Sequence, residues 1–168
     1  MSSDIEGIIT TTDPAAGPEL PAGTRAVPLS RPGLWFIPLT NPVTEALSTT
    51  PEDAELVAGF YYLTEGVARW ARALSEQGPV LYVQGETWAG EGFQAAIGWD
   101  RGKVCYEADF TRDRDGEGED WYEIVDRCDS AINTGLRSLG VTVEEGDHDE
   151  FDTAGLTLHR STTGWLTS

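Results

Sequence analysis

The stretch that decides the fold spans residues 80–110 and reads VLYVQGETWAGEGFQAAIGWDRGKVCYEADF. It contains three segments of strand length, at 80–86, 93–99 and 104–110, and the last two alternate between two faces. Asp100-Arg101-Gly102 is a connection short enough for a hairpin, with a glycine available for positive φ. We therefore expect three consecutive strands in an antiparallel meander with one apolar face.

Two helices are expected to cover that face. The first is predicted over about 51–77, because Thr50 can cap it, Pro51 suits its first position and Gly78-Pro79 ends it. Its apolar side chains recur every three or four residues, at Leu56, Phe60, Leu63, Val67, Trp70 and Leu74. The second is predicted over about 120–139, with Val125, Cys128, Ile132, Leu136 and Leu139 on its inner face and Gly140 after its end.

The fold class that follows is α+β, with a three- to four-stranded antiparallel sheet packed against two helices. A chain of 168 residues has the size of one domain. Residues 1–33 hold five of the nine prolines, so we expect a Pro/Gly-rich extended arm there and a single domain over 34–168, which begins with a short strand at 33–38.

The sequence also bears on the compartment. No apolar run approaches the ~20 residues that span a membrane. Residues 1–6 lack the basic and apolar character of a secretion signal, so a cytoplasmic protein is expected.

Acidity is the strongest compositional signal. The net charge is −18, and residues 105–152 alone hold sixteen Asp or Glu against four Arg, a net charge of −12. Direct nucleic-acid binding through phosphate neutralisation needs clustered basic residues and is not expected. A concentrated negative charge speeds the encounter with a basic protein, so we expect a basic partner.

Two groups of side chains are candidates for contact with that partner. The first forms a rim beside Gly90 and Gly92, and the second is an acidic loop with an aromatic residue at its end. The first group is Glu86, Trp88, Glu91 and Gln94, and the second is Asp113, Asp115, Glu117, Glu119, Asp120 and Trp121. Large aromatic residues such as Trp88 and Trp121 are typical anchors of protein interfaces.

No catalytic or metal-binding constellation is evident. The chain has no GxSxG elbow, and neither Cys105 nor Cys128 has a histidine nearby in sequence or forms a CxxC pair. Asp113, Asp115 and Glu117 resemble the start of a calcium loop, but Ile124 occupies its closing position. We expect no catalytic residue, no bound metal and no cofactor.

Four segments carry a resemblance: residues 86–99, the hairpin at 99–104, AINTGLRSLG at 131–140 and DEFDTAGLTLHRSTTGW at 149–165. Together they make residues 55–165 resemble small uncharacterised bacterial proteins, some of which are similar to immunity proteins of contact-dependent and polymorphic toxin systems. The shared motifs are structural rather than catalytic. The resemblance implies a cognate toxin as partner.

The leading hypothesis is an acidic, immunity-type inhibitor that neutralises a basic toxin or nuclease by electrostatic steering and occlusion. Two alternatives stay open. A DNA-mimic inhibitor of a nucleic-acid-binding protein would present carboxylates in a regular double row. A metal-dependent hydrolase would bring Glu86, Glu107, Asp109 or His148 together in one pocket.

Overall fold

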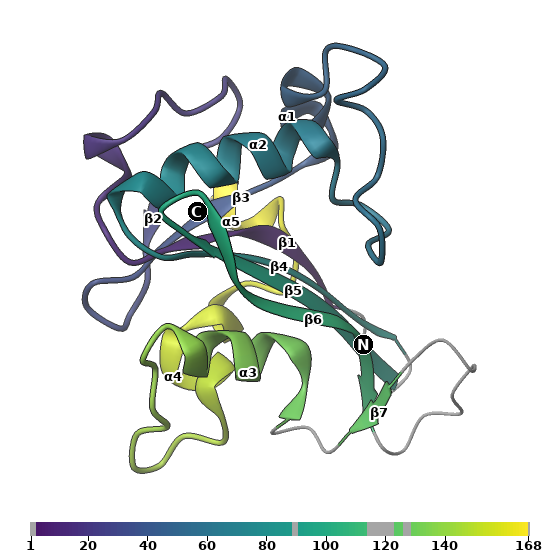
Figure 1. Ribbon diagram of the computed structural model, residues 1–168. Helices are drawn as coiled ribbons and strands as arrows, with labels where there is room; N and C mark the ends of the chain where they lie inside the picture. Colours follow the sequence, from purple (N-terminus) through teal and green to yellow (C-terminus); the bar gives the residue numbers. More distant parts are fainter. Residues whose placement is uncertain (1–2, 89–90, 114–122, 126–128, 168) are drawn as a thin grey trace.

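The computed structural model describes residues 3–88, 91–113, 123–125 and 129–167, and gives only the backbone at 3, 87, 88, 91, 108–113 and 123–125. Within these residues, one seven-stranded sheet has the order β2-β3-β1-β4-β5-β6-β7 (Figure 1). All neighbours are antiparallel except β7, which runs parallel to β6. The strands are β1 Ser3–Thr10, β2 Val27–Pro28, β3 Trp35–Pro38, β4 Val80–Trp88, β5 Glu91–Asp100, β6 Lys103–Asp113 and β7 Glu123–Val125.

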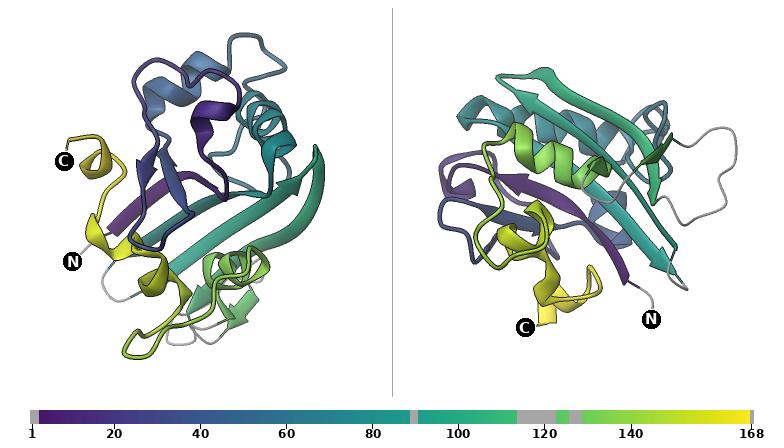
Figure 2. Two further views of the ribbon diagram at one scale, coloured as in Figure 1. Left: turned by 90° about the vertical axis from the view of Figure 1, so that its left-hand side faces the viewer. Right: turned by 90° about the horizontal axis from the view of Figure 1, so that it is seen from below.

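Helices cover both faces of the sheet. The α-helices are α1 Asn41–Leu47, α2 Glu65–Leu74, α3 Ala131–Ser138, α4 Glu150–Ala154 and α5 Gly164–Thr167, with 3₁₀ turns η1 Pro14–Ala16, η2 Ser75–Gln77 and η4 Leu156–Leu158. Figures 1 and 2 show α1 and α2 on one side of the sheet and α3 and α4 on the other. The protein is therefore α+β with three layers.

Two hydrophobic cores follow from this layering. Along β4, Val80 and Tyr82 enter the core under α2, whereas Leu81 and Val83 enter the core under α3. Because successive side chains of a strand point to opposite faces, a strand buried on both sides must be apolar throughout. This explains the unbroken run VLYV at 80–83.

The predicted sheet was too small. The three strands of the meander are present as β4, β5 and β6, and their hairpin turn places Arg101 and Gly102 at φ 51° and 77°. The prediction of three to four strands missed β1, which pairs with β4 on one side and with β3 on the other. Residues 3–10 of the expected arm thus lie within the sheet, because Ile5, Ile8 and Ile9 are buried in its two cores.

The predicted helix over 51–77 was wrong in its first half. In this range only α2 and the 3₁₀ turn η2 are helical. α2 begins after Thr64, whose side chain accepts a hydrogen bond from Val67 N. The preceding segment folds back on the start of α2 instead, since Glu65 N donates to Glu55 O and Gly66 N donates to Asp53 O. Gly59 takes φ 88°, a conformation that lets the chain turn between residues 53–55 and the start of α2.

The predicted helix over 120–139 was also wrong in its first half. The structure places the short strand β7 at Glu123–Val125 and starts α3 only at Ala131, directly after Ser130. The residues 120–122 and 126–128 lie outside the described part of the chain. Two helices were expected in total, and α1, α4 and α5 are additional. No helix in the described ranges has the length and apolar character needed to cross a membrane.

Candidate functional site

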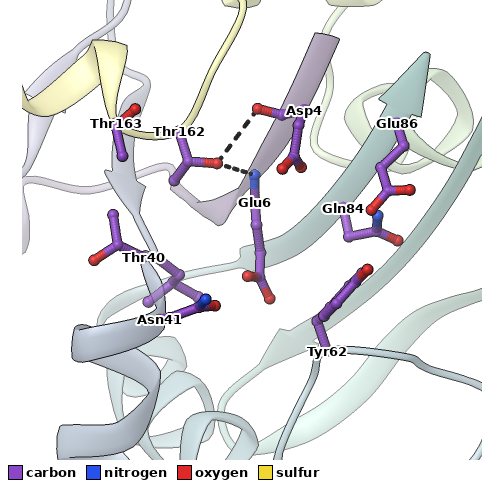
Figure 3. Close-up of a pocket in the computed structure, with 10 residues that line it drawn as sticks. Asp4, Glu6, Thr40, Asn41, Tyr62, Gln84, Glu86, Thr162 and Thr163 are labelled. Atoms are coloured by element: carbon purple, nitrogen blue, oxygen red, sulfur yellow. Dashed lines mark hydrogen bonds between the residues drawn. The ribbon is translucent and has the colours of Figure 1, made fainter. Parts of the chain in front are cut away.

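A pocket of about 310 Å³ opens on the α1–α2 side of the sheet, where the first half of β1 pairs with the second half of β4. We call it the acidic pocket. Its lining residues are Asp4, Glu6, Leu39, Thr40, Asn41, Tyr62, Gln84, Glu86, Thr162 and Thr163. These residues come from five separate parts of the chain, and Figure 3 shows their side chains around one space.

The floor of the pocket is set by the register of two strands. In the β1–β4 ladder, Asp4 lies opposite Glu86 and Glu6 lies opposite Gln84. Side chains directly opposite in such a ladder are close neighbours, and like charges there destabilise the sheet. The facing carboxylates of Asp4 and Glu86 thus work against folding, which is typical of a functional site rather than of a structural one.

The C-terminal segment forms one wall. β3 pairs only with Gly7–Thr10 of β1, and beyond that point residues 160–162 take its place: Asp4 N donates to Arg160 O at 2.8 Å. Thr162 Oγ1 accepts from Glu6 N at 2.9 Å and lies 3.4 Å from Asp4 O, the two contacts drawn in Figure 3. Both acidic residues of β1 are therefore held by their backbone.

Burial shapes the electrostatics of Glu6. Desolvation raises the pKa of Glu6 to about 7, and the charges of Asp4 and Glu86 act in the same direction. The Tyr82 hydroxyl donates to Glu6 Oε2 at 2.5 Å and opposes the rise in pKa. Burial also raises the pKa of Asp4 and, together with the neighbouring Glu86 carboxylate, that of Tyr62. A cation in the pocket would favour the ionised carboxylates and so lower the pKa values of Glu6 and Asp4.

Gln84 is the second unusual feature of the floor. Its side chain is only 2% exposed, yet neither Oε1 nor Nε2 has a hydrogen-bond partner among the described residues. Leaving a buried polar group unsatisfied costs about 1–3 kcal/mol. Glu86 lies two residues further along β4, so its side chain is on the same face of the strand (Figure 3). An unsatisfied amide in the wall of a pocket is expected where a ligand supplies the missing hydrogen bonds.

The structure places the first predicted group only in part. Glu86 lines the acidic pocket. Gln94 points to the other face of the sheet, where its Oε1 accepts from Ile132 N at 3.0 Å at the start of α3. Glu86 and Gln94 are therefore not brought together. The side chains of Trp88 and Glu91 lie outside the described residues.

The second predicted group cannot be placed. The backbone of Asp113 ends β6, but its side chain lies outside the described part of the chain, as do Asp115, Glu117, Glu119, Asp120 and Trp121 as a whole. The possible cation loop at 113–120 falls in the same region.

Of the residues of the hydrolase alternative whose side chains are described, Glu86 lines the acidic pocket, whereas Glu107 and His148 do not. Glu107 is exposed on β6, and His148 is exposed with its Nδ1 3.3 Å from Asp152 Oδ2. The side chain of Asp109 lies outside the described residues. Where the structure is described, no group of three or more His, Cys, Asp or Glu is arranged to hold a metal ion.

The sequence argument missed nine of the ten lining residues, and the four that carry the argument for a site are Asp4, Glu6, Tyr62 and Gln84. A signal for three of them is present. Asp4 and Glu6 alternate with the apolar residues of a strand, and Gln84 interrupts the apolar run at 80–83. Polar side chains in a strand that is buried on both faces are candidates for a site.

Comparison with known proteins does not identify the site: the chain matches no family model, no curated protein and no solved structure.

Proposed function

We propose that this chain is an acidic protein-binding module that holds a basic partner protein, as an immunity-type inhibitor holds a toxin or nuclease. The observation that carries the proposal is the acidic pocket. In it, Asp4 and Glu86 lie opposite each other on the adjacent strands β1 and β4, beside the buried Glu6. No described residue of its lining is basic. A positively charged group from outside would relieve this repulsion.

An exposed apolar segment that reaches the pocket through Tyr62 supports a protein as the ligand. Leu56, Tyr61 and Tyr62 are large apolar residues that are about half exposed, and all three belong to the segment that precedes α2. Tyr62 also lines the pocket. Protein interfaces combine such aromatic anchors with arginine and with a charged rim. The acidic pocket and its aromatic neighbours match one half of that arrangement.

The charge of the whole chain supports the same conclusion. A net charge of −18 steers a basic protein towards this one and accelerates association at low salt. The carboxylates of the pocket then contribute where the two surfaces are in contact. Occlusion of the partner requires no chemical step.

The test uses the full chain with an affinity tag, expressed in its native cell. A captured protein is purified and mixed with the untagged chain, and association is followed by stopped-flow fluorescence. We expect a basic partner whose association rate falls by about tenfold or more between about 50 and about 500 mM NaCl. We also expect that expression of the partner alone arrests growth and that co-expression of this chain restores it.

The comparison variants are Glu86→Gln in the pocket and Glu107→Gln on the exposed face of β6, which change the charge equally. Only Glu86→Gln should weaken the complex. An acidic partner, or a rate that does not respond to salt, would contradict the proposal. Displacement of DNA from a captured DNA-binding protein would support the DNA-mimic alternative instead.

A further inference from the structure

We infer that the acidic pocket is a receptor for one guanidinium group, the side chain of an arginine that the partner inserts. The source of the arginine rests on the proposed function. The chemistry of the pocket does not, because it follows from the lining residues themselves.

The arrangement of acceptors favours a guanidinium group. Carboxylates reach the pocket from both strands, with Asp4 and Glu6 on β1 and Glu86 on β4. Tyr82 donates to one oxygen of Glu6 and so holds that carboxylate in place. A guanidinium carries five N–H donors in a planar fork, which can bond several carboxylate oxygens at once, whereas an ammonium group is a point charge with three donors.

Gln84 supplies an independent argument. Its buried Oε1 lacks a donor and its Nε2 lacks an acceptor among the described residues. A guanidinium group on the pocket floor would give Oε1 the donor it lacks. Glu86 is on the same face of β4 as Gln84, and a ligand that draws its carboxylate towards the pocket floor would bring an acceptor to Nε2. A purely apolar ligand would leave both atoms unsatisfied.

Tyr62 and the size of the pocket narrow the choice further. The Tyr62 side chain is about half exposed and lines the opening, where its ring can stack on a planar cation. A volume of about 310 Å³ lies at the low end of ligand pockets, which hold about 300–1,000 Å³, and suits one long side chain. A bare metal ion fits less well, since among the described residues no three His, Cys, Asp or Glu side chains are arranged to hold one.

The experiment titrates the full chain, ¹⁵N-labelled, with Nα-acetyl-arginine amide, and compares the citrulline and lysine analogues. Citrulline has nearly the same shape without the charge. We expect saturable shifts of the backbone signals of Glu6, Tyr62, Gln84 and Glu86 with the arginine probe. Affinity should be about tenfold or more weaker for citrulline and several-fold weaker for lysine.

Variants locate the binding. Glu86→Gln and Gln84→Leu should each weaken the arginine probe by about tenfold or more, and Glu107→Gln should change its affinity by less than about twofold. Thermal unfolding followed by circular dichroism checks that each variant is folded. Equal binding of citrulline or lysine, or an equal loss in Glu107→Gln, would overturn the inference.

The result separates the two proposals. If the chain binds the protein partner and Glu86→Gln weakens that complex, but the arginine probe does not bind, then the inference fails and the proposed function stands. If the arginine probe binds as expected but no basic protein partner exists, then the pocket chemistry stands, and both the proposed function and the partner as the source of the arginine fail.

Discussion

Glu6 concentrates the conflict between folding and binding in a single residue. Its carboxylate is buried beside those of Asp4 and Glu86, so it is most stable in the folded protein when it is protonated. A basic ligand would instead favour the ionised form. The free protein therefore retains a destabilised site that binding can relieve, as is common where function rather than stability selects a residue.

The substitution Glu6→Gln tests this conflict through pH. The pKa of Glu6 is about 7 in the folded protein and lies near its ordinary value of 4.5 in the unfolded chain. Between these pH values the folded state binds more protons than the unfolded state, so the free energy of unfolding falls as pH rises from 4.5 to 7 and levels off above. The loss is at most about 3 kcal/mol.

Glu6→Gln keeps an acceptor for Tyr82 and removes the titration. We expect the variant to match the natural protein near pH 4.5 and to be more stable by about 2–3 kcal/mol at pH 8, as measured by urea unfolding at each pH. Glu107→Gln is the control for the loss of one charge. Parallel stability curves for the natural protein and Glu6→Gln would show that Glu6 is not destabilised by burial.

At the scale of elements, the sequence predicts those strands whose pairing is determined by neighbouring residues in the chain. The strands β4, β5 and β6 follow one another through short turns, so their alternation and the hairpin at Arg101–Gly102 were sufficient. β1 could not be predicted in its place, because it pairs with β4, more than seventy residues away along the chain. The acidic pocket shares that limit. Glu86 was identified beside a glycine-rich connection, whereas Asp4 and Glu6 join it only through the register of this distant pair.

Periodicity alone also misled the prediction of α2. Phe60 and Leu63 are buried as a helical stripe requires, but they reach the core from the turn segment that precedes the helix, and Leu56 is exposed. The burial of a side chain does not determine whether its backbone is helical or belongs to a turn. The start of α2 is fixed instead by the Thr64 cap and by a close approach at Gly66.

Gly66 tests that close approach. A Cβ atom at this position would lie 2.0 Å from Leu47 O at the end of α1. We expect Gly66→Ala to lower the free energy of unfolding by about 2 kcal/mol or more, although alanine favours a helix over glycine by about 1 kcal/mol. Urea unfolding measures the loss.

Gly135→Ala is the matched control in α3. There the added Cβ would meet the Leu81 side-chain methyl groups at 2.9 Å, and these can shift more easily than a backbone carbonyl. We expect a smaller loss than in Gly66→Ala. If Gly66→Ala is as stable as the natural protein, then α1 and α2 are not packed as closely as described.

At the scale of the molecule, segments near the two ends of the chain meet at the acidic pocket. Residues 160–162 continue the sheet along the first half of β1, and a few residues later Trp165 is buried in the core under α3. Trp165 is 1% exposed and its ring packs edge-on against Phe36, with centroids 5.1 Å apart. The pocket wall is thus anchored in the core, so the geometry of the site depends on the fold as a whole.

The net charge of −18 gives opposite responses to salt in stability and in binding. Repulsion between like charges is spread over the whole surface, and it weakens as the screening length falls from about 30 Å at 0.01 M salt to about 3 Å at 1 M. We therefore expect the unfolding temperature of the free protein to rise over this range of NaCl, as measured by differential scanning calorimetry. Association with a basic partner should slow over the same range, because salt also screens the attraction between the two oppositely charged proteins.

Glu6 separates the local effect from the global one. Buried charges are screened much less than exposed ones, so the stability difference between Glu6→Gln and the natural protein at pH 8 should persist in high salt. Sucrose, which stabilises folded proteins without screening charge, serves as the control and should not weaken the equilibrium affinity for the partner. An unfolding temperature that does not change with NaCl would mean that the negative charges are not close enough to repel one another in the folded state, and the acidity would then act on the partner alone.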